Sequence, residues 1–155
     1  MENLERILGE HAFLKGLSPD HLALMVGCAQ NVVFKADEYI LREGQPANHF
    51  YFIRQGLVHV ETHVPNKGTL TIRSRGAGEI LGWSWLVPPF RWHFDARAIE
   101  LTRVIALDGS CLRDKCESDH DFGYEIMRRF VLVIAERLEA TRLQLMDIYG
   151  NGPRT

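Results

Sequence analysis

Apolar residues recur at helical spacing in the first 29 positions of the chain. Leu4, Ile7 and Leu8 share one helix face, and a second helix is indicated by the later recurrence of Leu22, Met25, Val26 and Ala29. Between them, Ser18 is followed by Pro19 and Asp20, the pattern of an N-cap with proline at the first helical position. We therefore expect residues 1–29 to form a helical zone.

The pattern changes to short apolar runs separated by turn signals over residues 30–108. The runs fall at 32–34, 39–41, 50–53, 57–64, 69–72, 94–98 and 103–107. Glycines mark the turns between them, and Gly44 and Gly56 stand where a barrel would turn its corners. Many short strands with regular glycine turns are typical of a sandwich or jelly-roll barrel.

The last zone, residues 109–149, is helical again, with a short helix over 109–118 and a long one over 122–149. Residues along the long helix recur at alternating spacings of four and three: Met127, Val131, Ile134, Leu138, Thr141, Leu145 and Ile148. This is a heptad seam and predicts a homodimer; the alternative is one helix that only covers the barrel. The chain is predicted to be a single α+β domain, mainly β, over residues 1–155.

Helices, then a jelly roll, then a long helix is an order that resembles the cyclic-nucleotide-binding domain of the catabolite-activator (Crp/Fnr-like) family. Three segments carry the resemblance: Phe13 to Ser18, Glu43 to Val60, and the sequence Gly-Glu-Ile-Leu-Gly at 78–82. The resemblance covers nearly the whole chain. It implies a regulatory module that binds a cyclic nucleotide, cyclic AMP or cyclic GMP, and signals through the long helix.

The stretch from Gly78 to Arg97 holds the candidate binding site. Gly82 lets the backbone approach a ligand, and Trp83 to Val87 can form one helical turn, with Ser84 in it, whose free N–H groups face an anion. Two prolines end the turn, and Arg91 then offers a guanidinium suited to phosphate oxygens. The resemblance implies that this arginine holds the cyclic phosphate. A surface ion pair of Arg91 with Asp95 or Glu79 is the alternative.

The same stretch departs from the family pattern. Trp83 stands where the family has a carboxylate for the ribose hydroxyl, and indole cannot accept a hydrogen bond. Trp92 replaces a small or hydroxyl residue after the arginine. An alignment on Gly78 and Glu79 restores a carboxylate but lengthens the distance to Arg91. The tryptophans either stack on a flat ligand or fill the pocket.

Thr141 is a further candidate ligand residue. It interrupts the apolar seam of the long helix, and the resemblance implies a contact from this position to the base of the nucleotide. The alternative is a β-branched residue tolerated in a coiled coil.

Composition and charge exclude several classes of protein. A net charge of −2 in 155 residues is not that of a nucleic-acid-binding surface, and no run approaches the ~18 apolar residues of a membrane span. Without a secretory signal, the protein is expected in the cytoplasm. The chain has an odd number of cysteines without paired spacing, Cys28, Cys111 and Cys116, so we expect reduced thiols. Three cysteines are also too few to hold an iron–sulfur cluster by cysteine alone.

Catalytic and metal chemistry are not indicated. His59, Glu61 and His63 alternate along one strand, but Val58 and Val60 would take the inward face and leave the set exposed rather than holding zinc. No phosphate-binding loop or nucleophile elbow is present, so no enzyme activity or required cofactor is expected.

After Gly150 only residues 151–155 follow, too few for a DNA-reading helix pair, so this chain alone is not expected to bind DNA. Three functions stay open: a stand-alone sensor module, an interaction module whose pocket is filled by tryptophan, and a truncated transcription regulator.

Overall fold

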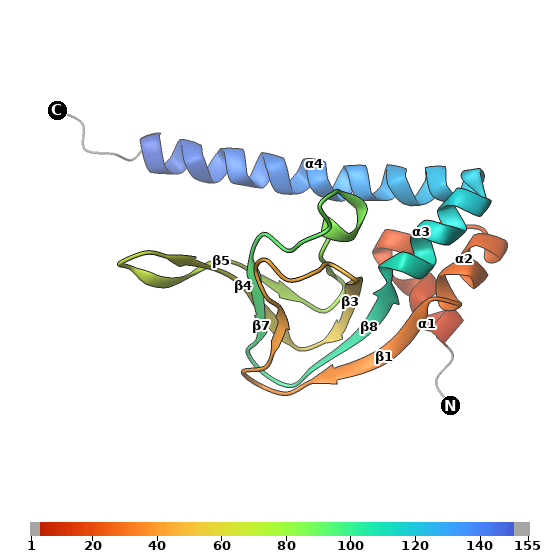
Figure 1. The fold of residues 1–155 in the computed structure, drawn as a ribbon, viewed down its shortest axis with the longest axis horizontal. Helices are drawn as coiled ribbons and strands as arrows, with labels where there is room; N and C mark the ends of the chain where they lie inside the picture. The colour runs from red at the N-terminus through yellow and green to blue at the C-terminus, as the bar shows by residue number, and fades with distance from the viewer. Residues whose placement is uncertain (1–3, 151–155) are drawn as a thin grey trace.

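A computed structural model describes residues 4–150, and the expectations for residues 1–3 and 151–155 lie outside that range. The described part folds into two four-stranded antiparallel sheets that close into a roll, with short helices at one end and a long helix along one side (Figure 1). The N-terminal helices are α1 (Leu4–Glu10), the short 3-10 helix η1 (Ala12–Leu14) and α2 (Pro19–Val26). The Ser18 hydroxyl accepts from the His21 N–H at 3.2 Å, which confirms the predicted N-cap.

The roll follows the predicted strands closely. One sheet has the order β1 (Ala29–Phe34), β8 (Thr102–Asp108), β3 (His49–Gln55) and β6 (Ile80–Leu81). The other has the order β2 (Tyr39–Leu41), β7 (Asp95–Ala98), β4 (Leu57–Val64) and β5 (Gly68–Gly76). Only the two-residue strand β6 was absent from the sequence prediction, because so short a run gives no periodicity.

The first sheet separates two hydrophobic cores. Ile80 of β6 and Ile105 of β8 face the helices, in a cluster that also holds Phe50, Phe122 and Phe130. Their neighbours along the same strands face the inside of the roll, in a second cluster formed by Leu41, Ala47, Ile53, Val58, Val60, Leu81, Trp92, Ala96 and Val104. Successive side chains of a strand point to opposite faces, so this sheet is buried on both sides.

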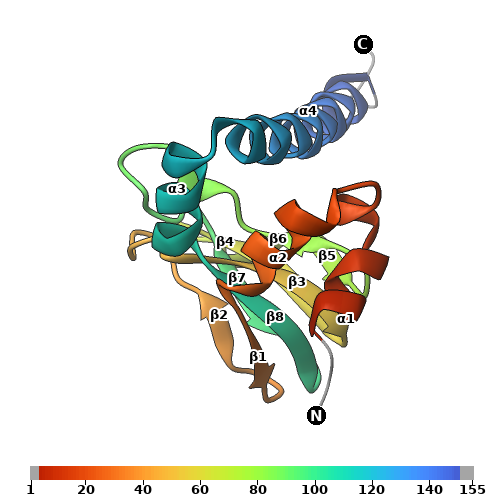
Figure 2. The same cartoon turned by 90° about the vertical axis from the view of Figure 1, so that its right-hand side faces the viewer.

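Two helices complete the fold, α3 (Gly109–Ser118) and α4 (His120–Gly150). In both ribbon views α4 runs along one side of the roll (Figures 1 and 2). Phe122, Ile126 and Phe130 anchor its first turns in the helical core, whereas every residue from 141 to 150 is exposed. No helix within residues 4–150 has both the length and the apolar character that a membrane span requires.

The strand faces of β4 follow the prediction, but one side chain on the outer face is buried. Val58 and Val60 belong to the inner core, whereas His59 pairs with Arg97 of β7 on the opposite face of the sheet. Glu61 was expected to be exposed on this outer face, but it is 2% exposed and accepts two 3.1 Å hydrogen bonds from the Arg97 guanidinium. Alternation in the sequence predicts the face of a strand residue, but not a distant side chain that covers it.

The expectation of reduced cysteines is also wrong for two of the three. Cys28 and Cys111 form a disulfide across 83 residues of sequence, and Cys116 is free. The antiparallel pairing of Ala29 with Leu107 brings the end of α2 next to the start of α3. Counting cysteines does not reveal this proximity, because it is a consequence of strand pairing.

Candidate functional site

The predicted helical turn after Gly82 is present as the 3-10 helix η2 (Ser84–Leu86), flanked by Trp83 and Val87. Gly82 has a φ of +95°, a conformation that favours glycine. A Cβ at this position would lie 2.7 Å from the Trp92 ring, closer than any side chain tolerates. The close approach that the glycine permits is therefore to Trp92 and not to open space.

Trp92 occupies the inside of the roll at the predicted anion cradle. Its side chain is 5% exposed and packs with Leu41, Leu81 and Val104 in the inner core. The backbone of residues 90–92 pairs with residues 44–47, through Trp92 N–H to Gln45 at 3.0 Å and Gly44 N–H to Trp92 at 2.9 Å. This pairing fixes the indole as part of the core.

Arg91 points away from the cradle as a consequence. Neighbours in an extended segment lie on opposite sides, so an inward Trp92 leaves Arg91 outward. Its side chain is exposed, and Nη1 donates to the Gly44 carbonyl at 2.8 Å. The alternative ion pairs are not formed either, since Glu79 pairs with Arg75 and Asp95 accepts from the Glu43 N–H.

The other aromatic and polar residues of this segment also belong to the core more than to a pocket. Trp85 is fully buried and stacks on Phe50 with a centroid distance of 4.9 Å. Ser84 is 2% exposed, and within the described residues its hydroxyl has no hydrogen-bond partner. Trp83 is half-buried, with its ring 6.3 Å from that of His93. The six predicted site residues do not surround a common cavity.

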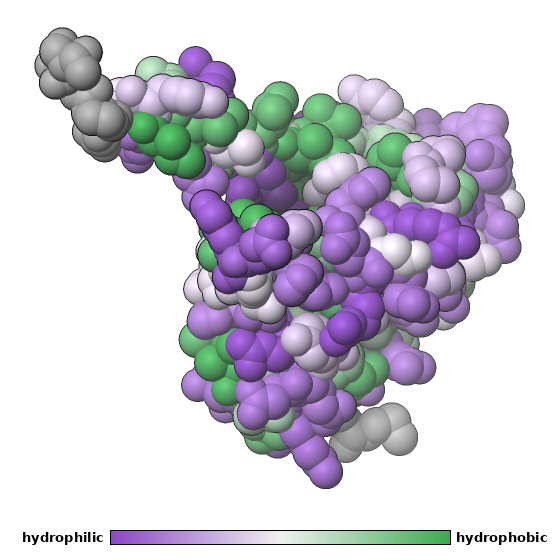
Figure 3. Space-filling view, turned by 60° about the vertical axis from the view of Figure 1, so that its left-hand side comes forward, coloured by the Kyte–Doolittle hydropathy of each residue, from purple (hydrophilic) through white to green (hydrophobic). Residues whose placement is uncertain are grey.

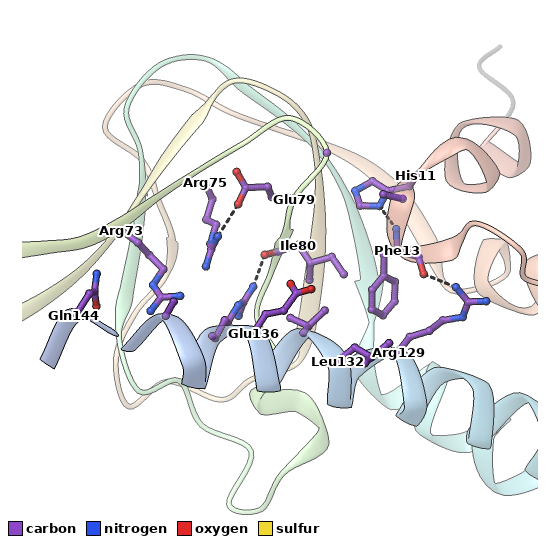
Figure 4. Close-up of a pocket in the computed structure, with 15 residues that line it drawn as sticks. His11, Phe13, Arg73, Arg75, Glu79, Ile80, Arg129, Leu132, Glu136 and Gln144 are labelled. Carbon is purple, nitrogen blue, oxygen red and sulfur yellow. Dashed lines mark hydrogen bonds and ion pairs between the residues drawn. The ribbon is translucent and has the colours of Figure 1, made fainter. Parts of the chain in front are cut away.

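A cleft of about 680 Å³ lies instead between strands β5 and β6, η1 and α4 (Figure 4). Ile80, which faces the helical core, lines it, whereas its neighbour Leu81 packs with Trp92 inside the roll. The volume lies in the range of small-molecule sites, roughly 300–1,000 Å³. Ile80 thus faces the cleft, whereas Leu81 faces the filled cradle.

Arginine dominates the charge of this cleft. Arg73 and Arg75 alternate along β5, and Arg129 and Arg137 come from α4, against two glutamates, Glu79 and Glu136. The remaining lining residues are His11, Ala12, Phe13, Gly78, Ile80, Leu132, Val133, Ala140 and Gln144. Figure 4 shows Arg73, Arg75 and Glu79 facing the space between β5 and α4. Four guanidiniums from two elements favour an anionic ligand.

Two of the arginines, Arg75 and Arg129, each lie within ion-pair distance of a carboxylate. Arg75 pairs with Glu79 at 2.7 Å, and Arg129 donates to the Phe13 carbonyl at 2.7 Å. Arg129 also lies 3.6 Å from the Glu125 carboxylate. These two side chains are therefore positioned by the protein before any ligand arrives.

The other two arginines are less well compensated. Arg137 donates to the Ile80 carbonyl at 2.6 Å, and Arg73 donates to the Thr141 hydroxyl at 3.3 Å. Within residues 4–150 neither has a carboxylate in ion-pair contact. Burial, with Arg75 and Arg73 adding repulsion, lowers the pKa of Arg137 to about 10, and burial together with Arg75 lowers the pKa of Arg73. A bound anion would relieve this repulsion.

His11 at the end of the cleft is held in its neutral form. Burial lowers its pKa, and Nδ1 accepts from the Phe13 N–H at 3.2 Å, so this nitrogen carries no proton. Its ring lies 4.5 Å from that of Phe52, which is fully buried in the helical core. The histidine therefore adds polarity without charge.

Thr141 does not line the cleft, but it is the predicted site residue that contacts arginines of the cleft. Its hydroxyl accepts from Arg73 and donates to the Arg137 carbonyl at 2.9 Å, so it joins β5 to α4 at the rim. The arginines themselves were missed by sequence reasoning. The period-two spacing of Arg73 and Arg75, and the position of Arg137 one helical turn before Thr141, were the available signals.

Comparison with known proteins gives the family that the fold indicates. The model of the cyclic nucleotide-binding domain family matches residues 31–119, more than half of the chain, so the chain belongs to this family. Its structural neighbours are Crp-like cyclic nucleotide-binding proteins. A cyclic nucleotide-binding domain from Methylobacillus flagellatus KT superposes with a TM-score of 0.79 at 21% identity, over 97% of this chain and 83% of that one.

Two further relatives are informative. The structure of a cyclic nucleotide-binding-like protein from Brucella abortus is 32% identical, with a TM-score of 0.60, over 73% of this chain and 97% of that one. Glutaminase 2 of Bradyrhizobium diazoefficiens is 25% identical over 144 residues, which is 92% of this chain but 22% of that protein. The chain thus spans about a fifth of that relative.

Proposed function

We propose that this chain is a non-catalytic regulatory module of the cytoplasm that binds a cyclic nucleotide, or a related anionic nucleotide, in the arginine cleft beneath α4. The observation that carries the proposal is the pair Arg73 and Arg137, two guanidiniums with no carboxylate partner among the described residues, on facing walls of the cleft. The cyclic nucleotide-binding family supplies the ligand class.

The site is placed to act on α4. Arg73 belongs to β5 of the roll, whereas Arg137 and Thr141 belong to α4, and Arg137 holds the helix to the carbonyl of Ile80. A phosphate between the two arginines draws β5 and α4 together or competes for these bonds. Either effect shifts the equilibrium between positions of α4, which is how a ligand with different affinity for two states acts.

The test is calorimetric titration with cyclic AMP and cyclic GMP, with pyrophosphate as a probe for the charge alone. We expect saturable heat with a nucleotide, and at least about a tenfold loss of affinity in Arg73→Ala, which removes one charge-assisted hydrogen bond. Arg91→Ala is the matched control, an exposed arginine outside the cleft, and should bind within about twofold of wild type. The proposal is wrong if Arg91→Ala abolishes binding and Arg73→Ala does not.

A second function is favoured by one specific observation, the burial of Trp92 in the cradle. If no nucleotide gives heat, the chain is an interaction module of the same family whose cradle is permanently occupied by its own side chain. Such a module acts through α4 without a ligand.

We further propose that the protein is a homodimer through α4. The seam residues Met127, Val131, Leu138 and Leu145 are each between 47% and 69% exposed, and Ile134 is half-buried. Figure 3 shows apolar side chains gathered along this helix. A heptad seam that the roll leaves uncovered is a surface suited to a second copy of the same helix.

Sedimentation at micromolar concentration tests the dimer. The wild type should sediment as two chains and Leu138→Lys as one, because a lysine in the seam brings two charges together in an apolar contact. Leu143→Lys is the control, since Leu143 is 50% exposed on α4 but lies outside the seam. A monomeric wild type, or equal effects of the two variants, contradicts the proposal.

A further inference from the structure

The disulfide between Cys28 and Cys111 joins the two helical parts of the molecule. Cys28 follows the last turn of α2, and Cys111 lies in the first turn of α3, which leads directly into α4. Only Asp119 separates α3 from α4. The bond therefore ties the N-terminal helices to the base of the helix that carries both the cleft and the seam.

The disulfide can be reached from solvent. A small cleft of about 210 Å³ opens onto it, lined by Gly27, Cys28, Ala29, Gln30, His49, Ala106, Asp108 and Cys111. Cys28 is 8% exposed, whereas Cys111 is half-buried and is the more accessible of the two. A thiol reagent thus has a route to the Cys111 sulfur.

Other interactions hold the same elements when the bond is open. The Asp108 N–H donates to the Cys28 carbonyl at 3.0 Å, and the Asp108 carboxylate caps α3 through the Cys111 N–H at 3.0 Å. Lys115 of α3 donates to the Leu24 carbonyl at 2.9 Å. The two cysteines therefore stay close in the reduced protein, which lets the bond form again.

We propose that Cys28 and Cys111 form a reversible thiol–disulfide site whose state sets how firmly α3 and the start of α4 are held to the rest of the fold. In the oxidised state α3 is covalently fixed to the end of α2. In the reduced state α3 is held by non-covalent contacts alone, which include the hydrogen bonds named above and the burial of Leu112, and it opens more often. The proposal does not depend on the ligand of the arginine cleft.

The co-reactant is a dithiol of the kind that reduces protein disulfides. One of its thiolates attacks the Cys111 Sγ, the bond between the cysteines breaks, and Cys28 leaves as a thiolate and takes up a proton. The second thiol of the reagent then attacks the mixed disulfide, and Cys111 is released as a thiol. Two electrons and two protons pass to the protein, and the dithiol becomes a disulfide. A small disulfide reverses the exchange.

The experiment is reduction of the native protein with millimolar dithiothreitol, followed by free-thiol counting and hydrogen exchange. We expect the thiol count to rise from one to three without loss of the folded state. Amides of α3 and the first turn of α4 should then exchange at least about tenfold faster, while those of β3 and β8 stay within about twofold. Cys111→Ser should show the fast exchange with or without reductant.

Cys116→Ser is the matched control, because Cys116 lies in the same helix but outside the disulfide. It should respond to dithiothreitol as the wild type does. Three results each overturn the proposal: a bond that resists reduction in the native protein, reduction with no change in α3 exchange, or unfolding of the whole roll on reduction.

Discussion

The cradle at Gly82 and the arginine cleft beneath α4 lie on opposite faces of the same short strand, β6. The cradle has a glycine at positive φ followed by a helical turn, but the Trp92 ring fills it. The cleft has no such backbone pattern, yet it is open and lined by four arginines. The predicted cradle is therefore a packed part of the core, whereas the arginines line a separate cleft.

The difference shows what decides whether a site is open. In the cradle, the side chain that follows Arg91 is large and faces inward, so burial of apolar surface is favoured over keeping a cavity. In the cleft, the arginines cannot pack without desolvating one another, and the lowered pKa of Arg137 reflects that cost. The apolar cradle is therefore closed by its own side chain, whereas the charged cleft stays open.

The largest expected effect on the free energy of unfolding comes from a substitution in the filled cradle. Trp92→Ala should lower the free energy of unfolding by about 3–5 kcal/mol, because it removes a buried ring and leaves a cavity in the inner core. Urea denaturation measures the change. Trp83→Ala is the control at a half-buried position and should cost clearly less; equal losses would mean that Trp92 is not the residue that fills the cradle.

A smaller effect should come from Gly82. Gly82→Ala forces a Cβ to within 2.7 Å of the Trp92 ring, while Gly78→Ala, at a similar φ of +86°, meets nothing within 4 Å. Both substitutions place an alanine at positive φ and carry similar backbone strain. The difference between their free energies of unfolding therefore measures the clash of the new Cβ with the Trp92 ring, and should be about 1–3 kcal/mol. Chemical denaturation of the pair measures it, and equal stabilities would contradict the contact with Trp92.

The smallest effect on stability should be in the cleft. Arg137→Met is expected to change the free energy of unfolding by less than about 1 kcal/mol at pH 7, or to increase it, because a desolvated and repelled charge is removed. The same variant should lose nucleotide affinity, which separates binding from folding. A loss above about 3 kcal/mol would mean that Arg137 is a structural residue of α4.

The pH dependence of that variant has a defined sign. The folded-state pKa of Arg137, about 10, lies below its ordinary value, so the unfolded chain binds more protons at pH values above about 10. The destabilising contribution of the charge is complete below pH 10 and fades as the pH rises above it. The advantage of Arg137→Met should therefore be constant from pH 7 to 9 and shrink above about pH 10.

Much of the fold could be predicted from the sequence because its signals are local. Glycine turns, the Ser18–Pro19 cap and the apolar spacing of the long helix each depend on a few neighbouring residues. The candidate site could not be predicted in the same way. Arg91 and Trp92 are adjacent, and a shift of the strand pairing by one residue would exchange which of the two side chains faces inward. The backbone pairing of residues 90–92 with 44–47 determines that Trp92 faces inward.

The cleft and the disulfide depend on long-range contacts. Arg73 and Thr141 meet across 68 residues, and Cys28 and Cys111 across 83. No local spacing indicates either pair. The burial of Glu61 is a third case, because Arg97, which covers it, lies 36 residues further along the chain.

The location of the ligand can be tested most directly by following individual arginines during a nucleotide titration. Side-chain Nε–H signals of Arg73, Arg75, Arg137 and Arg91 can be assigned by NMR and monitored as cyclic AMP or cyclic GMP is added. The account predicts saturable shifts for the three arginines of the cleft and none for Arg91. Shifts at Arg91 and at the Gly82 amide, with the cleft arginines unmoved, would place the ligand in the cradle and contradict it.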